Sequence, residues 1–82
     1  MAQSKEQSNV LKSFGANVRR LRVQAGLTQA RLAEMADVEL RTEQKWDRGE
    51  INPPLTTVAR VQGILGCGWE NLLGTPLASK RR

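Results

Sequence analysis

Apolar residues along the chain recur at steps of three and four, the spacing that gives a helix one apolar stripe. The pattern is clearest in two segments, one from about Asn9 to a glycine stop at Gly26 and one over about residues 55–65. No run alternates apolar and polar residues with the β-branched enrichment typical of a strand. The pattern therefore predicts an all-α chain.

Two shorter helices are predicted between these segments from their start and stop signals. Thr28 is a capping residue followed by an apolar periodic run, which predicts a helix over about residues 29–36. Asp37 marks a tight turn, because aspartate tolerates the left-handed conformation better than most residues. A further helix should then run over about residues 39–48 and end at Gly49.

The ends of the chain differ in character from its middle. A fifth short helix is expected over residues 69–73, before a glycine and a proline. We thus expect five helices within residues 9–74. A polar flexible arm over residues 1–8 precedes them, and a basic tail over residues 75–82 follows.

Length and composition narrow the classes of function. A chain of 82 residues has material for one small domain and no large catalytic cleft. Its net charge of +5 favours a polyanionic partner such as nucleic acid or an anionic membrane surface, although the same charge also serves simple solubility.

Several kinds of site lack the residues that they need. With no histidine and a single cysteine, Cys67, the chain offers no intramolecular disulfide, almost no ligands for a closed zinc site and no histidine base. We therefore expect no enzyme, no metal and no cofactor. No apolar run approaches the roughly 20 residues of a membrane span, and the N-terminus lacks the order of a secretory signal, so a cytoplasmic protein is expected.

The two helices around Asp37 match the physical needs of a helix-turn-helix. The second helix must be narrow and polar on one face to enter a major groove about 12 Å wide, and residues 39–48 carry three basic side chains and Gln44. Gln29, at the start of the first helix, can present its amide to a phosphate.

At this point the residues resemble a known family. The order LRVQAGLTQARLAEMADV, then Thr42, Trp46, DRG, NPPLTT and ILGCGWENLLG, is similar to the lambda-repressor-like helix-turn-helix family of the XRE or Cro type. The resemblance covers about residues 14–74. It implies a five-helix DNA-binding domain with a central helix-turn-helix, which binds a palindromic operator as a homodimer and regulates transcription without a separate ligand domain.

The resemblance also assigns roles to individual residues. Residues that read bases or touch the neighbouring backbone are expected at Leu40, Arg41, Gln44 and Lys45. Phosphate contacts are expected from Arg22, Gln29, Arg48 and Asn52. Arg22 also corresponds to a basic position that pairs with an acidic residue, here Asp47, and we favour this structural ion pair over the phosphate role, although both can hold.

The chain departs from the family pattern at two glutamates. Glu39 stands where the family prefers serine or threonine, and its carboxylate can cap the helix or accept from cytosine N4. Glu43 stands where the family has an apolar residue, so it must lie at a margin of the core, pair with a basic side chain such as Arg31 or Arg60, or shift its helix.

Apolar residues outside the helix-turn-helix have structural interpretations. Trp46, four residues after Thr42, is expected in the core rather than as a stacking platform. An apolar patch of Ile64, Trp69 and Leu73 is the predicted dimer interface, because a small domain has little core of its own.

Two classes of function follow from the sequence. The first is a sequence-specific regulator that acts on double-stranded DNA, whether Cro-like repressor, restriction-modification controller protein or antitoxin. The second is a protein-interaction module, for example antitoxin-like, that keeps the fold but has weak or no sequence-specific DNA binding, and the two glutamates are its best support.

Overall fold

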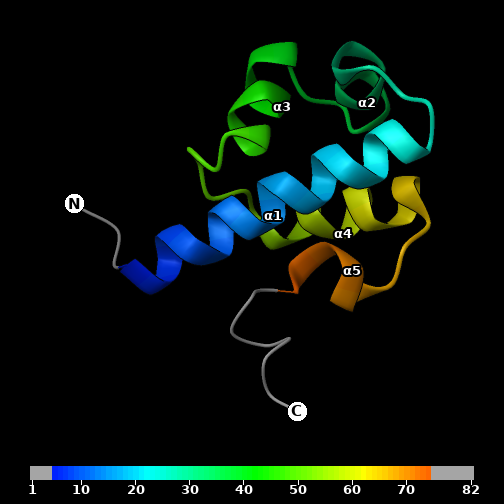
Figure 1. The fold of residues 1–82 in the computed structure, drawn as a ribbon. Helices are drawn as coiled ribbons and strands as arrows, with labels where there is room; N and C mark the ends of the chain where they lie inside the picture. The colour runs from blue at the N-terminus through cyan, green and yellow to red at the C-terminus, as the bar shows by residue number, and fades with distance from the viewer. Residues whose placement is uncertain (1–4, 75–82) are drawn as a thin grey trace.

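The computed structural model describes residues 5–74, and these residues form five helices and no strand (Figure 1). In chain order the helices are α1 Lys5–Gln24, α2 Gln29–Met35, α3 Leu40–Asp47, α4 Leu55–Leu65 and α5 Trp69–Leu73. The all-α prediction is confirmed, and each predicted helix is present with ends close to those expected. Within the described residues, no helix is long and apolar enough to cross a membrane.

The start of α1 is the largest difference from the predicted boundaries. Residues 5–8, expected in the arm, form the first turn of α1, while residues 1–4 and the expected tail over residues 75–82 lie outside the described residues. The apolar pattern missed this turn because residues 5–8 are all polar and carry no apolar period. The first buried side chain of α1 is Leu11, and the N-terminal end of the helix projects past the other elements in Figure 1.

The core lies where α1 crosses the remaining helices. In Figure 1, α2 and α3 lie on one side of α1, and α5 lies on the other. Trp46 of α3 is 1% exposed, and its ring meets Phe14 of α1 edge to face, with centroids 6.4 Å apart. The prediction that Trp46 is a core residue is thus confirmed. The buried cluster around this pair also contains Val18, Leu32, Ala36, Val58, Val61 and Leu72.

The start of α2 and the turn between α2 and α3 have the local structure that the sequence predicts. The Thr28 hydroxyl accepts from the Arg31 amide at 3.0 Å and caps α2. Asp37 has φ of 60°, the left-handed conformation that reverses the chain after α2. The Val38 amide then donates to the Ala33 carbonyl at 2.9 Å, which closes the turn and fixes where α3 begins.

Helix α5 is held to α1 by its last carbonyl groups, which have no partner inside the helix. Asn17 of α1 donates to the Leu72 carbonyl at 2.8 Å and to the Gly74 carbonyl at 3.2 Å. Arg20, one turn further along α1, donates to the Asn71 carbonyl at 3.3 Å. These bonds place α5 on the side of α1 opposite to α2 and α3.

Candidate nucleic-acid interface

Helix α3 has two clearly different faces. Glu43 and Trp46 point inwards and are 0% and 1% exposed. Leu40 and Arg41 are exposed, and Gln44 and Lys45 are half-buried. The structure therefore brings together, on one outward face, all of the side chains that were predicted to read bases: Leu40, Arg41, Gln44 and Lys45.

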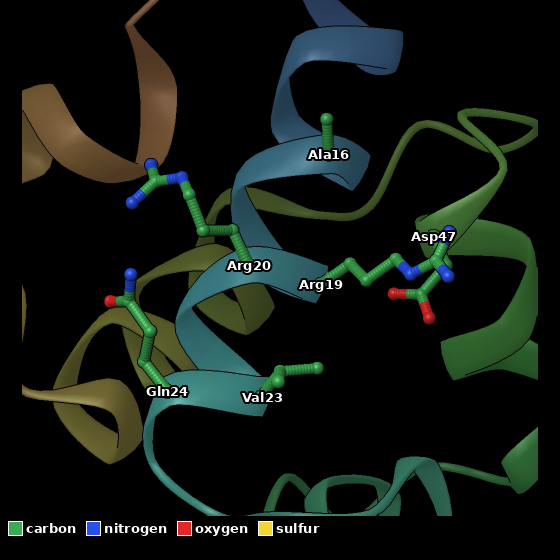
Figure 2. Close-up of a pocket in the computed structure, with 6 residues that line it drawn as sticks. All are labelled: Ala16, Arg19, Arg20, Val23, Gln24 and Asp47. Carbon is green, nitrogen blue, oxygen red and sulfur yellow. The ribbon is translucent and has the colours of Figure 1, made fainter.

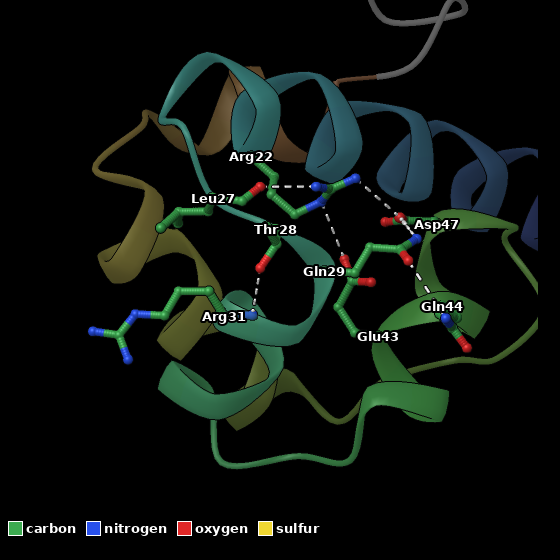
Figure 3. Close-up of polar contacts among 8 residues, drawn as sticks. All are labelled: Arg22, Leu27, Thr28, Gln29, Arg31, Glu43, Gln44 and Asp47. Carbon is green, nitrogen blue, oxygen red and sulfur yellow. Dashed lines mark hydrogen bonds and ion pairs between the residues drawn. The ribbon is translucent and has the colours of Figure 1, made fainter.

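Gln29 lies beside this face, at the first residue of α2 (Figure 3). Its Oε1 accepts from Gln44 Nε2 at 3.4 Å, and its Nε2 donates to Asp47 Oδ2 at 2.9 Å. No pattern in the sequence predicts these two bonds, because they join residues 15 and 18 positions apart on different helices. The predicted phosphate residue is thus connected both to a predicted base-reading residue and to a buried carboxylate.

Two other predicted phosphate residues follow α3 in the chain. Arg48 and Asn52 are both exposed. Arg48 Nε lies 3.0 Å from Glu50 Oε2, and both side chains are at least half exposed. An exposed ion pair of this kind contributes little to stability, so a phosphate can compete for Arg48 at small cost.

A buried polar cluster lies behind the outward face and consists of Arg22, Glu43 and Asp47. Arg22 Nε lies 3.6 Å from Glu43 Oε2, and Arg22 Nη2 lies 3.6 Å from Asp47 Oδ2. The structure therefore brings together the ion pair expected between Arg22 and Asp47. It also adds a second carboxylate, so that two acidic groups share one guanidinium. Both acidic residues belong to α3 and are four positions apart, the spacing that puts them on one face.

Glu43 pairs with a basic side chain, which is one of the arrangements expected for it, but its partner is neither of the two residues named as examples. It is fully buried rather than marginal, and neither Arg31 nor Arg60 pairs with it. Arg31 pairs with Glu34 at 2.8 Å, and Arg60 donates to the Ala36 carbonyl at 2.9 Å. The correct partner is Arg22, which reaches position 43 because α1 packs directly against α3.

The environment of Glu43 opposes its charge. The pKa of Glu43 is raised from 4.5 to about 8, first by burial and then by a hydrogen bond with Asp47 and repulsion from its charge, while the charge of Arg22 lowers it. Neither oxygen of Glu43 has a hydrogen-bond donor among the described residues, because Arg22 Nε at 3.6 Å is beyond hydrogen-bond range. The carboxyl group is therefore favoured in its protonated form near neutral pH.

The Arg22 side chain makes its contacts inside the protein. Its Nη1 donates to the Leu27 carbonyl at 2.8 Å, which ties α1 to the loop before α2, and only 10% of its side chain is exposed. These contacts favour the structural role over the predicted phosphate contact. Arg22 is therefore not among the residues proposed to contact phosphate.

The capping role expected for Glu39 is wrong. Glu39 is the residue before the first turn of α3, but its side chain makes no capping hydrogen bond there. Its backbone carbonyl instead accepts from the Thr42 amide at 2.9 Å, and the exposed carboxylate is left on the surface.

The predicted dimer patch is apolar and partly open. Trp69 and Leu73 of α5 are 45% and 38% exposed, whereas Ile64 of α4 is half-buried and packs on the core cluster. The side chains of Trp69 and Leu73 thus remain available to a second molecule.

A shallow hollow of about 560 Å³ lies on the outer face of α1 (Figure 2). It is lined by Ala16, Arg19, Arg20, Val23, Gln24 and Asp47. The hollow is open to solvent, unlike the enclosed clefts that bury most of a small ligand. Two of its lining residues are arginines, Arg19 and Arg20, and its openness does not suit a site for a metabolite.

Solved structures show which proteins share this arrangement. No protein-family model and no curated protein matches the chain. The chain is similar to two structures of a clp gene regulator, ClgR, from Corynebacterium glutamicum, with 26% identity, a TM-score of 0.74, and coverage of 78% of this chain and 82% or 68% of the other. It is also similar to a hypothetical transcription factor, NHTF, from Neisseria, with 22% identity, a TM-score of 0.77, and coverage of 96% and 91%. The chain therefore has the all-α helix-turn-helix fold found in these transcription regulators.

Proposed function

We propose that this protein is a sequence-specific DNA-binding transcription regulator that places α3 in the major groove of double-stranded DNA. One observation carries the proposal: the candidate base-reading side chains share the outward face of α3, while Glu43 and Trp46 lie inside. A carboxylate at position 43 on the outward face would repel the phosphate groups of DNA. Because Glu43 is buried, it does not face the DNA. The similarity to ClgR, described as a clp gene regulator, supports the same function.

Each side chain on this surface would contact either a base or the phosphate backbone. Arg41 or Lys45 donates to guanine O6 and N7, and Gln44 contacts an adjacent base. Gln29, Arg48 and Asn52 contact the phosphate backbone, which fixes the register of α3 without reading sequence. Leu40 makes apolar contact at the start of the helix.

The proposed active form is a homodimer on a palindromic operator. Two copies, joined through Ile64, Trp69 and Leu73, present their α3 helices to successive major grooves about 34 Å apart. The exposure of Trp69 and Leu73 supports this assignment.

Burial of Glu43 also weakens the alternative that the protein is only an interaction module. That alternative drew on two glutamates near the groove surface, and only Glu39 is exposed there. If the protein binds no DNA, the function of a protein-interaction module is favoured instead.

The test is a titration of duplex DNA at increasing salt. Binding to random duplex should be measurable at about 50 mM salt and should fall steeply as salt rises, because phosphate contacts release counterions. Arg41→Ala should lose about 1 to 3 kcal/mol on a selected operator and relax one base position. Lys5→Ala removes the same charge at the far end of α1 and should leave that base preference unchanged. Absence of binding to any duplex at low salt would reject the proposal.

A further inference from the structure

A chain of three side chains connects the buried side of α3 to its outward face (Figure 3). Gln29 Nε2 donates to Asp47 Oδ2 at 2.9 Å, and Gln44 Nε2 donates to Gln29 Oε1 at 3.4 Å. The chain leaves α3 at Asp47, passes through the first residue of α2 and returns to α3 at Gln44.

The direction of these hydrogen bonds is set at Asp47. A carboxylate accepts hydrogen bonds and has no N–H to donate, so only the NH₂ end of the Gln29 amide can face it. The carbonyl end of Gln29 then faces Gln44, and only the NH₂ end of that second amide can satisfy it. Asp47 does not face the groove, but through Gln29 it sets the orientation of the Gln44 side-chain amide.

Asp47 is well fixed for this role. Its side chain is 8% exposed, and its Oδ2 lies 3.6 Å from Arg22 Nη2. Arg22 is itself held by its bond to the Leu27 carbonyl at 2.8 Å. The acceptor that orients Gln29 is therefore anchored to α1 and to the loop before α2, neither of which depends on DNA.

We infer that Asp47 is a positioning residue for base reading, which acts through Gln29 to hold the Gln44 amide in the orientation that recognises adenine. The inference rests on the proposed function and names the base that Gln44 reads. With one N–H donated to Gln29, Gln44 keeps Oε1 and its second N–H for the groove. Adenine offers the complementary pair, a donor at N6 and an acceptor at N7, whereas guanine offers two acceptors.

The sequence preference of single and double variants tests this inference. In selection from random duplexes, the unaltered protein should prefer adenine at one position of each half-site by about 5- to 150-fold, the range for a bidentate contact. Gln44→Ala should abolish that preference. Asp47→Ala should relax the same position and leave the others unchanged, and the double variant should lose no further discrimination at it. Equal loss at every position would show that Asp47 only supports the fold.

A second variant covers the case in which Asp47→Ala does not fold. Gln29→Met has nearly the same length, leaves the Arg22–Asp47 pair in place and breaks the middle of the chain. It should weaken binding to all DNA through loss of a phosphate contact, and it should also relax the adenine position. Full adenine preference in a folded Gln29→Met protein would overturn the inference. Glu50→Ala is the matched control, since it removes a negative charge near the same end of α3 without touching the three residues.

A measurement without DNA separates failure of this inference from failure of the proposed function. Asp47→Ala should shift the side-chain amide NMR signals of both Gln29 and Gln44, and Glu50→Ala should shift neither. An unmoved Gln44 signal would show that the second hydrogen bond does not transmit orientation, which refutes the inference even in a protein that binds DNA. Shifted signals in a protein that binds no duplex would refute the proposed function, and the adenine assignment with it.

Discussion

At the residue scale, Glu43 carries the least favourable environment described in the structure. It is fully buried, lies 3.6 Å from the Arg22 guanidinium and has no hydrogen-bond donor among the described residues. A buried carboxylate in such a site costs free energy, and the cost is offset only in part by the nearby cation. Because Asp47 already pairs with Arg22, removal of the Glu43 carboxyl group leaves the guanidinium with an acidic partner.

We therefore expect Glu43→Met to stabilise the protein. Methionine has a similar length, carries no charge and adapts to irregular packing, so the free energy of unfolding should rise by about 1 to 3 kcal/mol. Unfolding by urea measures this change. Glu34→Met is the control, since Glu34 is an exposed glutamate on α2 whose substitution should change stability by less than about 0.5 kcal/mol. A loss of stability in Glu43→Met would mean that the contacts of Glu43 with Arg22 and Asp47 outweigh the cost of burying its carboxyl group.

The raised pKa of Glu43 also predicts how stability depends on pH. Between 4.5, the ordinary pKa of glutamate, and about 8, the pKa of Glu43 in the folded protein, the native state holds a proton that the unfolded chain has lost. The contribution of this group to stability should therefore be fully present below the lower value and should fall as pH rises towards 8, by up to about 1.4 kcal/mol per pH unit. Urea unfolding at several pH values in this window measures the slope. The slope should flatten in Glu43→Met, and an equal slope in both proteins would assign it to other groups.

At the element scale, the position of α3 depends on how closely α1 approaches it. A Cβ added to Gly15 of α1 would overlap the carbonyl oxygen of Trp46 and would lie 2.9 Å from that of Asp47. These carbonyls belong to the backbone of α3 and its last turn, so they cannot move aside as a flexible side chain would. The close approach is also what lets Arg22 reach Glu43 and Asp47.

Two glycine substitutions separate this packing effect from helix propensity. Gly15→Ala should lower the free energy of unfolding by about 1 to 3 kcal/mol, because α3 must shift to relieve the overlap. Gly63→Ala, in α4, meets nothing within 4 Å and should raise stability by about 0.5 to 1 kcal/mol through propensity alone. Thermal or urea unfolding distinguishes the two. A Gly15→Ala protein as stable as the parent would show that the spacing of α1 and α3 is not set at this residue.

At the scale of the whole molecule, a small core and an exposed apolar patch favour association. A domain of this size buries a modest share of its surface, and Trp69 remains 45% exposed and Leu73 38% exposed on α5. Burial of these side chains against a second copy would remove apolar surface from water and place two α3 helices on one DNA duplex.

Sedimentation tests the role of this patch. The parent protein should form dimers at micromolar concentration, and a Trp69→Ser, Leu73→Ser double variant should sediment as a monomer with lower operator affinity. Val23→Ser removes an apolar side chain that is 61% exposed on α1 and should leave the dimer intact. A parent protein that stays monomeric with and without DNA would contradict the two-fold arrangement.

The sequence by itself determined the helices and the fold class, because the signals involved are local. Thr28, Asp37 and Gly49 set the ends of α2 and α3 through capping and left-handed turns, and each acts within a few residues of itself. The position of Trp46 four residues after Thr42, on one face of a short helix, likewise predicted that it lies in the core. The first turn of α1 escaped prediction because its residues are polar and carry no apolar period.

Only the tertiary structure decided which polar groups meet. The sequence put Glu43 on the inward face of its helix, but its partner depends on which element packs over that face, and this is α1 with Arg22. The bonds from Gln29 to Asp47 and Gln44 likewise exist because α2 starts beside α3. Helix periodicity fixes the direction of a side chain relative to its own axis, whereas the partner that it reaches is fixed by the angle and distance at which two helices cross.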